Sequence, residues 1–378
     1  MINLPLLKYE CRKIKKPIFG NHVLILIQHL LRDSISLVRA FEKCGAEQED
    51  IFVIGIPYSS KSEVIKELSS DFKVFTPSYP IDDEVKKIIK KAVEVCKKKN
   101  KKLLIIEDGG YAVPIIHLEL NEALKYCIGA VEQTTNGVWR DEEVILNFPV
   151  LTIAFSELKK ELESPEIGNA VVRNIQMLLS KRGDFIRGKK VILAGYGTIG
   201  RQIAESLRND GCVVGVSDPD PKKLIAARFK GFNTDSMLNL VKNGDIIVGA
   251  SGRRSIGIKE ILSAKNNAIL VNASSKRVEI DVEVIENLKE TKNKIDGVGT
   301  EYELINRNRL LLLADGYPVN FYNSESVPDK IIDVILTELF LCATELIKRE
   351  FSKTIHKSLQ SIINEDELAD TFTQLHIN

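Results

Sequence analysis

The sequence predicts an α/β protein with two doubly wound parallel-sheet domains and a long C-terminal helix that returns to the first domain. Three observations predict this class. Strand-like apolar runs alternate with helical patterns early in the chain, the alternation begins again near residue 189, and an amphipathic pattern follows Pro328. The chain has 378 residues, 44% of them apolar, which suits a globular protein of two or three domains.

The first domain is predicted over residues 1–168. Its strands are short apolar runs, and the helices between them have apolar residues at spacings of three and four. Because strands and helices alternate, the sheet is predicted to be parallel. The serines before the second helix are expected to cap its N-terminus. The predicted strands are 22–31, 50–58, 72–79 and 102–110, and the predicted helices are 33–46, 59–72 and 82–102.

The second domain is predicted over residues 169–325 and repeats this alternation. The C-terminal part, 326–378, begins with an amphipathic helix over 326–350 and continues as a polar tail. This helix has more apolar residues than one face needs, so we expect it to pack between domains, on the first domain or on a second subunit. In the second domain the strands are predicted at 189–197, 211–219, 244–252, 267–274 and 310–316, with helices at 198–210, 219–231 and 258–265.

Charge and cysteine usage disfavour several classes of function. Lys and Arg total 53 and Asp and Glu total 52, which argues against a general binder of nucleic acid or anionic membranes. No apolar run reaches the length of about 18 residues that a membrane span needs, and the N-terminus lacks a signal-peptide pattern. The six cysteines and five histidines show no metal-ligand spacing, so no metal site is predicted. Scattered cysteines are typical of reduced, buried thiols, and we expect a cytoplasmic protein.

A glycine-rich turn predicts a dinucleotide site in the second domain. Gly195, Gly197 and Gly200 form the pattern G-x-G-x-x-G directly after a strand and at the start of a helix. The first glycine permits the tight turn, the second lets the backbone approach a pyrophosphate, and the third lets helix and strand pack closely. Thr198 and Ile199 begin the helix, where free N–H groups can meet the phosphate charge.

Asp218 ends the next predicted strand, 18 residues after Gly200. Its carboxylate can accept hydrogen bonds from the adenosine ribose and would repel a 2′-phosphate, which favours NAD over NADP. The second domain is therefore predicted to be a Rossmann NAD-binding domain; the alternatives are a structural glycine turn and a degenerate domain without a ligand. Ala250, Ser251 and Gly252 follow another strand and are predicted to touch the cofactor, with a simple tight turn as the alternative.

Five separated segments resemble S-adenosylhomocysteine hydrolases, in the same order along the chain and over about residues 20–345. The cofactor turn is generic, but the combination of the DGG and TTNGV segments is specific. The segments are EDGGYAVP, VEQTTNGVWR, AGYGTIGRQIAESLRNDGCVV, VEIDVEVIENL and LLLADGYPVNFYNSES.

The resemblance implies a redox route to hydrolysis. That family holds NAD⁺ tightly and uses it to oxidise the 3′-hydroxyl of the substrate ribose. The ketone acidifies the 4′ C–H, a base removes that proton, and a thiol is eliminated. Water then adds and the hydride returns, so the cofactor acts catalytically.

The resemblance also implies roles for single residues in catalysis. His29 matches a histidine beside the departing homocysteine, and Asp108 matches the catalytic aspartate. Lys159 or Lys160 matches the lysine that takes the 3′-hydroxyl proton, and Gln133 stands where the family has a ribose-binding glutamate. The alternatives are a satisfied loop histidine, a turn-forming aspartate and a solvated pair of lysines.

On the cofactor side, the resemblance implies four further residues. Thr134, Thr135 and Asn136 match three threonines that face the nicotinamide ribose and carboxamide, and Asn320 matches an asparagine that holds the carboxamide. Hydroxyl and amide groups suit these roles because they both donate and accept hydrogen bonds. The implied cofactor is NAD.

Several positions depart from the family pattern, mostly on the substrate side. An aspartate–asparagine pair reads Ser164–Pro165, a cysteine reads Asn169, and two histidine motifs read Ser274–Arg277 and Ser326–Pro328. The family's C-terminal lysine and tyrosine have no clear match. A positioned base contributes about 10²–10⁴ in rate, so these losses predict an altered substrate or reaction.

The predicted function is that of an NAD-binding, adenosylhomocysteinase-like enzyme. It would act on a nucleoside or sugar-containing small molecule by transient hydroxyl oxidation with elimination or hydrolysis. A simple NAD-dependent dehydrogenase and a non-catalytic NAD-sensing or partner-binding relative are the alternatives. We expect a homodimer or homotetramer, and neither a nucleic-acid nor a membrane partner.

Overall fold

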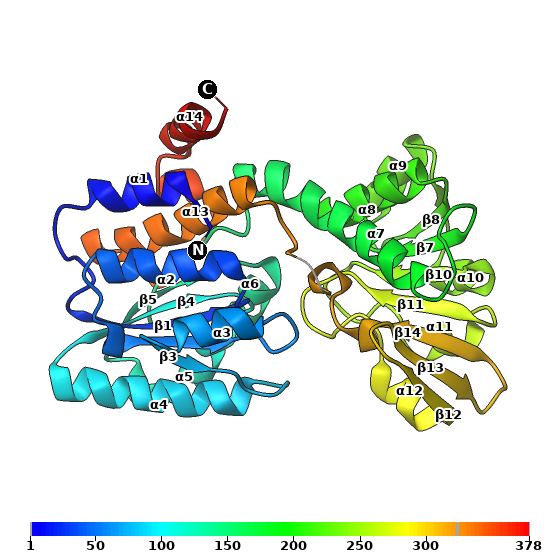
Figure 1. Cartoon of the computed structure of the whole chain (residues 1–378), viewed down its shortest axis with the longest axis horizontal. Coiled ribbons are helices and arrows are strands. Elements are labelled where there is room, and N and C mark those ends of the chain that lie inside the picture. The colour runs from blue at the N-terminus through cyan, green and yellow to red at the C-terminus, as the bar shows by residue number, and fades with distance from the viewer. Residues whose placement is uncertain (1, 323–324, 378) are drawn as a thin grey trace. The chain divides into compact units, whose positions relative to one another are not determined.

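Two sheets organise the chain, and each has helices on both faces (Figure 1). The computed structural model describes residues 2–322 and 325–377. One sheet belongs to a unit made of Met1–Glu161 and Pro328–Asn378, and the other to a unit made of Leu162–Val327. Among the described residues, every helix is too short or too polar to cross a lipid bilayer.

The sheet of the first unit has seven parallel strands in the order β15-β6-β5-β4-β1-β2-β3. The central strands are buried almost along their whole length, which is why they appear in the sequence as unbroken apolar runs. The strands are β1 (His22–Gln28), β2 (Ile51–Gly55), β3 (Lys73–Phe75), β4 (Lys102–Glu107), β5 (Cys127–Glu132), β6 (Val150–Thr152) and β15 (Ile355–His356).

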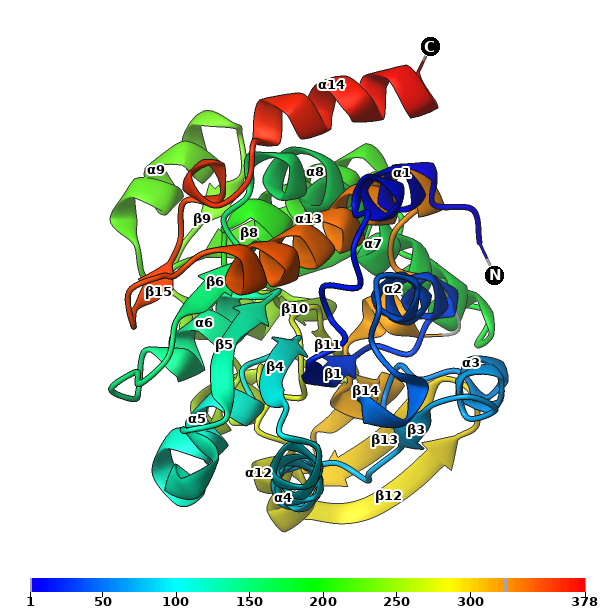
Figure 2. The same cartoon turned by 90° about the vertical axis from the view of Figure 1, so that its left-hand side faces the viewer.

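Helices cover both faces of this sheet, as Figure 2 shows. One face carries α2 (Arg32–Lys43) and α13 (Asp329–Lys348), with α1 (Pro5–Lys13) packed on these two helices, and the other carries α4 (Asp82–Lys99) and α5 (Ala112–Glu119). The remaining helices are α3 (Ser62–Leu68), α6 (Thr135–Asp141) and α14 (Glu365–His376). The predicted return of the C-terminal helix to the first domain is confirmed. Because α13 is buried against α1, α2 and β5, its large apolar surface is covered within this unit.

Both ends of the chain meet at Asp333 of α13. Its carboxylate accepts the backbone N–H groups of Leu6 and Leu7 at 2.8 and 2.9 Å. Nε2 of His376, in α14, lies 2.8 Å from the same carboxylate. This buried group therefore joins the first and last helices to α13.

The expected serine cap of α3 is wrong. The helix begins after Lys61, which makes no side-chain cap. Ser59 and Ser60 instead donate their hydroxyls to the carbonyl oxygen of Ile56, at 3.1 and 2.8 Å. Since Ile56 directly follows β2, the serines stabilise the turn that leaves the sheet.

The sheet of the second unit has eight strands in the order β12-β13-β14-β11-β10-β7-β8-β9. The strands from β14 to β9 are parallel, which confirms the predicted doubly wound fold, and an unforeseen antiparallel hairpin extends one edge. The strands are β7 (Lys190–Ala194), β8 (Val213–Ser217), β9 (Asn233–Thr234), β10 (Ile246–Gly249), β11 (Ala268–Asn272), β12 (Lys289–Ile295), β13 (Gly299–Leu304) and β14 (Arg309–Leu313).

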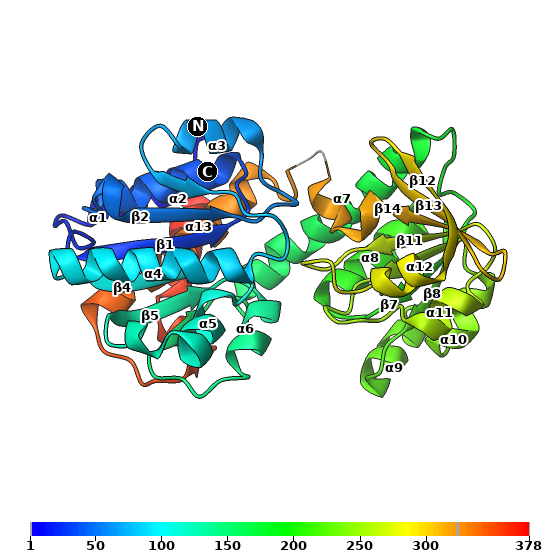
Figure 3. The ribbon, with the colours of Figure 1, turned by 90° about the horizontal axis from the view of Figure 1, so that it is seen from below.

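Two helical layers enclose this second sheet. Apolar residues of α7 (Ser164–Ser180), α8 (Thr198–Asn209) and α9 (Pro221–Phe229) pack on one face. Those of α10 (Met237–Leu240), α11 (Ile258–Ser263) and α12 (Val282–Leu288) pack on the other, as Figure 3 shows for α11 and α12.

Each sheet has a point between two parallel strands near its centre where the strand order reverses. In the first unit the chain runs from β1 through β2 to β3 and then returns to β4 on the other side of β1. In the second it runs from β7 through β8 to β9 and returns to β10 beside β7. Ligands of open α/β sheets bind at the carboxyl ends of the strands that flank such a reversal. The ends of β1 and β4, and of β7 and β10, are therefore the candidate ligand sites.

Candidate cofactor and active site

The turn after β7 has the backbone geometry that a dinucleotide needs. Gly195 has φ +103°, and a Cβ there would lie 2.6 Å from the carbonyl oxygen of Ala250. A Cβ on Gly200 would lie 2.2 Å from the carbonyl oxygen of Gly195. Both glycines are thus required by internal packing.

The middle glycine is different, because its environment is open. A Cβ on Gly197 would have no described atom within 4 Å. Gly197 is the N-cap of α8, so Thr198 and Ile199 begin the helix and their N–H groups have no acceptor within it. This is the position at which a pyrophosphate could approach the backbone, so the turn fits the cofactor.

Asp218 follows β8 and is nearly buried. One of its oxygens accepts the N–H of Tyr196 at 2.7 Å, and the other accepts the N–H of Asp220 at 2.9 Å. The Lys223 ammonium lies 3.6 Å away. Because a carboxylate oxygen has two lone pairs, Asp218 can hold the glycine turn and still accept hydrogen bonds from a ribose.

The loop after β10 lies beside the glycine turn and is held by a buried carboxylate. The N–H of Ala250 donates to the carbonyl oxygen of Ala194 at 2.8 Å. Glu279 accepts the N–H groups of Ser251 and Gly252, both at 2.6 Å, and the Ser251 hydroxyl at 2.8 Å. Burial raises the pKa of Glu279. The N–H groups of this loop are thus engaged within the protein, and the predicted cofactor contacts of residues 250–252 stay a prediction.

Asn320 is buried in the second unit, in a short helical turn after β14. Its Nδ2 donates to the hydroxyl of Ser326 at 3.0 Å. Its backbone carbonyl, together with that of Val319, accepts from Nδ2 of Asn174 at 3.2 and 2.8 Å. Asn174 of α7 therefore fixes the segment that carries Asn320, and sequence reasoning did not single it out.

His29 and Asp108 meet at the strand reversal of the first unit. His29 follows β1, Asp108 follows β4, and His29 Nε2 lies 3.6 Å from Asp108 Oδ2. Nδ1 of His29 lies 2.5 Å from the hydroxyl of Ser59. Burial lowers the pKa of His29, Asp108 opposes this shift, and the Lys159 ammonium adds to it.

The two candidate lysines have different surroundings in the first unit. Lys159 is close enough to His29 for its charge to affect the histidine. The Lys160 ammonium lies 6.0 Å from the centre of the Phe155 ring. Both belong to the π-helical turn η3 (Lys159–Glu163), and the Lys159 N–H donates to the Ser156 hydroxyl at 3.1 Å. Of the two lysines, Lys159 is thus the one whose charge affects His29.

Glu132 joins the segments EDGGYAVP and VEQTTNGVWR, whose combination is the specific part of the family resemblance. It accepts the N–H groups of Gly109 and Gly110 at 3.0 and 2.8 Å. It also accepts both the N–H and the hydroxyl of Thr134 at 2.7 Å. The turn after Asp108 and the start of α6 are thus held by one buried carboxylate.

Two glycines make room for this arrangement. A Cβ on Gly137 would lie 2.0 Å from the carboxylate carbon of Glu132. Gly110 has φ +60°, and a Cβ there would lie 2.6 Å from the Gly137 carbonyl oxygen. Segments 107–113 and 132–138 are therefore one packed structure.

Glu107 provides a second anchor for the turn after β4. Its carboxylate accepts the backbone N–H groups of Tyr111, Ala112 and Val113 at 2.6, 2.7 and 3.2 Å, at the N-terminus of α5. Burial raises the pKa of Glu107, and it raises the pKa of Glu132 to about 8, with the charges of Glu107 and Asp108 adding to the latter shift. Sequence reasoning missed both glutamates, although each stands directly before a residue that it did select.

The remaining candidates lie at the start of α6. The Thr134 hydroxyl accepts the N–H of Gly137 at 3.0 Å, and Thr135 and Asn136 open the helix. The N–H of Gln133 donates to the carbonyl oxygen of Glu107 at 2.9 Å. The Gln133 side-chain oxygen is buried and has no hydrogen-bond partner among the described residues.

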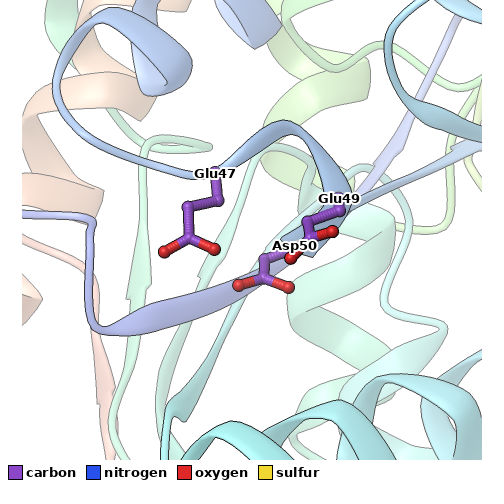
Figure 4. A group of neighbouring side chains, drawn as sticks. All are labelled: Glu47, Glu49 and Asp50. Carbon is purple, nitrogen blue, oxygen red and sulfur yellow. The ribbon is translucent and has the colours of Figure 1, made fainter.

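A cluster of three acidic side chains elsewhere in the first unit is paired with two lysines. Figure 4 shows Glu47, Glu49 and Asp50 gathered before β2. The Lys99 ammonium contacts all three, with 2.8 Å to Asp50, and the Lys101 ammonium lies 2.6 Å from Asp50 and 2.8 Å from Glu47. We therefore assign this cluster a structural role.

Comparison with known proteins identifies the family. A dipicolinate synthase component from Bacillus halodurans has a similar fold, with a TM-score of 0.51 at 13% identity over 88% of this chain and 99% of that one. Residues 174–326 match the family "S-adenosyl-L-homocysteine hydrolase, NAD binding domain". Adenosylhomocysteinase of Pyrococcus abyssi is 30% identical over 364 residues, which cover 93% of this chain and 82% of the relative. The chain belongs to the S-adenosyl-L-homocysteine hydrolase family.

Membership confirms the resemblance and the prediction that NAD is the cofactor. Within this family the relatives differ in their named substrates. S-inosyl-L-homocysteine hydrolase of Methanopyrus kandleri is 33% identical over 238 residues, which cover 61% of this chain and 55% of the relative. The roles of the single residues in the S-adenosyl-L-homocysteine hydrolase fold stay predictions.

Proposed function

We propose that this protein is an NAD-dependent enzyme that oxidises a hydroxyl of a nucleoside or sugar-containing small molecule transiently and so eliminates or hydrolyses a neighbouring bond. The single observation that carries the proposal is the His29–Asp108 pair at the strand reversal of the first unit, with Lys159 nearby. An acid, a base and a cation gathered at a strand reversal are suited to proton transfer.

The cofactor supplies the hydride acceptor, and the chain's own residues move protons. Lys159 takes the proton of the hydroxyl that is oxidised. The single proton of the Ser59 hydroxyl goes to the Ile56 carbonyl oxygen, so Ser59 accepts the Nδ1–H of His29. That tautomer leaves a lone pair on Nε2, beside Asp108, as the atom that exchanges a proton with the substrate or the leaving group.

We also propose that the substrate differs from that of the family's adenosine-specific members. Gln133 places a neutral amide where the family pattern has a carboxylate, and its buried side-chain oxygen can accept a single hydroxyl proton. The Ser326 hydroxyl, in a segment where the family has a histidine, accepts from Asn320 within its own unit. These changes fit a nucleoside thioether whose base or sugar hydroxyls differ from those of adenosine.

The test is a two-channel assay on the purified protein. S-adenosyl- and S-inosylhomocysteine are supplied separately, then other nucleoside thioethers, while free thiol and reduced cofactor are measured together. We expect thiol release with only a small, transient reduced-cofactor signal. The Asp108→Asn variant should lose this turnover by at least about 10²-fold, whereas the exposed Asp83→Asn control should keep it.

Two outcomes would overturn the proposal. Accumulation of one reduced cofactor per substrate would indicate a simple dehydrogenase. Bound NAD with no product from any thioether, and no difference between the two variants, would indicate a non-catalytic NAD-binding relative.

A further inference from the structure

Two cysteines that are far apart in the sequence meet where α1 packs against α2. Sγ of Cys11 lies 2.9 Å from Sγ of Cys44. Both side chains are nearly buried, with exposed fractions of 9% and 2%. Unbonded sulfur atoms rest farther apart than this, and a disulfide requires about 2.05 Å. The pair is thus less than one ångström from bonding distance.

The backbone holds both cysteines in place. Cys11 lies in α1, whose N-terminal end is fixed to Asp333 of α13 through the N–H groups of Leu6 and Leu7. Cys44 is the C-cap of α2, and α2 packs against α13 through its buried face. Since both helices are anchored independently of the sulfurs, the two thiols stay paired without a covalent bond.

The surroundings make the two thiols chemically unequal. The hydrogen bond from Cys44 lowers the pKa of Cys11 to about 7, and the charges of Lys43 and Arg12 add to this shift although burial opposes it. By contrast, burial raises the pKa of Cys212 to about 11. Because the thiolate is the reactive form, Cys11 is the nucleophile of the pair.

We propose that Cys11 and Cys44 form a redox-modification site at which a hydroperoxide closes an intramolecular disulfide between α1 and α2. The Cys11 thiolate attacks one peroxide oxygen, the O–O bond breaks, and a sulfenic acid forms as hydroxide or an alkoxide leaves and takes up the proton that the thiol had released. The Cys44 thiol then attacks that sulfur, and the sulfenic oxygen leaves as water as the disulfide forms. Two thiols are oxidised, one peroxide is reduced, and a thiol reductant reverses the change.

The disulfide would lock the N-terminal helix onto the first unit. It would close a loop between residues 11 and 44, so the unfolded chain would lose conformational freedom while the folded chain changes little. This inference does not depend on the proposed enzymatic activity. A loop of this length should raise the melting temperature by several degrees, roughly 5 °C or more.

The experiment uses the full chain, reduced, freed of reductant and treated with a small excess of hydrogen peroxide. Denaturation, alkylation and mass spectrometry should show the loss of two hydrogens and one cross-linked peptide pair that contains Cys11 and Cys44. The melting temperature should rise on oxidation and fall again with dithiothreitol. Cys11→Ser and Cys44→Ser should abolish both effects, whereas Cys212→Ser should keep them.

The wild-type peptide map decides the matter even if a serine variant folds poorly. Alkylation of both Cys11 and Cys44 after peroxide treatment would contradict the proposal. A cross-link that joins other cysteines or two copies of the chain would contradict it as well.

Discussion

At the scale of single residues, buried polar groups of the first unit hold the candidate catalytic pair in place. His29 is fixed by Ser59 at one ring nitrogen, and Asp108 begins a turn that Glu107 and Glu132 hold through backbone N–H groups. None of these supporting residues follows a periodic pattern, because a carboxylate that binds N–H groups leaves no spacing signal in the sequence.

The Ser59 hydroxyl offers a matched pair of variants, because Ser60 donates to the same carbonyl oxygen of Ile56. Ser59→Ala removes the partner of His29 Nδ1, so it should lower kcat about tenfold or more while the NAD content per chain stays the same. Ser60→Ala should leave kcat within about a factor of two. Equal losses in the two variants would mean that the orientation of His29 is not controlled by Ser59.

Glu132 should make stability depend on pH. Its pKa is raised from 4.5 to about 8 in the folded chain, so between these values the folded state keeps a proton that the unfolded chain releases. The free energy of unfolding should therefore decrease as the pH rises from about 4.5 through 8. Glu132→Gln cannot titrate there, so its unfolding free energy should decrease less over this window.

Urea unfolding at pH 5, 7 and 9 would measure this difference. The variant starts from a lower stability, by about 1–3 kcal/mol, because buried N–H groups lose their acceptor. The exposed Glu143→Gln variant is the control and should follow the wild type. Parallel pH profiles for Glu132→Gln and the wild type would disprove the role of this titration.

At the scale of elements, the turn at Asp108–Gly110 packs against α6. This packing decides whether Gly137→Ala stabilises or destabilises the protein. Replacing a helical glycine by alanine normally stabilises a helix by about 1 kcal/mol. Here the new Cβ would lie 2.0 Å from the Glu132 carboxylate carbon, so Gly137→Ala should lower the free energy of unfolding by at least about 2 kcal/mol.

The control for this substitution is Gly257→Ala at the N-cap of α11. A Cβ there would lie 3.5 Å from Glu260 Oε2, which is an ordinary contact, so the change should cost less than about 1 kcal/mol. Chemical denaturation of both variants would compare them, and a Gly137→Ala protein as stable as the control would show that Glu132 can move aside.

Strands that form long apolar runs could be predicted from the sequence, whereas the buried strands β5 and β6 were missed. Strands such as β1 and β10 are unbroken apolar runs, and the glycine turn has a defined spacing. The edge strand β12 is almost wholly exposed and charged, so it resembles a loop, and β15 has only two residues. The serines before α3 resembled caps because their composition suits a cap, but a nearer carbonyl satisfies them.

At the scale of the whole molecule, the chain crosses between its two units only twice, at Glu161–Leu162 and at Val327–Pro328. The first unit carries the candidate proton-transfer residues, and the second carries the glycine turn and Asp218. The contacts that support either group come from residues distant in the sequence, such as Glu279 for residues 251–252. Spacing therefore predicted the glycine turn and Asp218, and the family resemblance supplied the other candidate residues, but neither predicted the residues that hold them in place.

The preference for NAD over NADP should be measurable as a difference in the stability that each nucleotide gives to the whole protein. Protein stripped of nucleotide should gain about 2.7 kcal/mol when NAD is present at 100 times its Kd. NADP should give little or no gain at the same concentration, because the Asp218 carboxylate repels a 2′-phosphate. Thermal melting with each nucleotide would compare them, and equal shifts would refute the assigned role of Asp218.

Asp333 has a practical consequence for anyone who engineers this chain. The same carboxylate is shared by the first helix and the last, so a change at one terminus is felt at the other. A chain that ends before His376 would lack the imidazole that favours the ionised form of Asp333. Leu6, which this carboxylate holds more than 300 positions upstream, would then be less firmly fixed. Affinity tags and fusion partners are therefore better placed in an exposed loop than at either terminus.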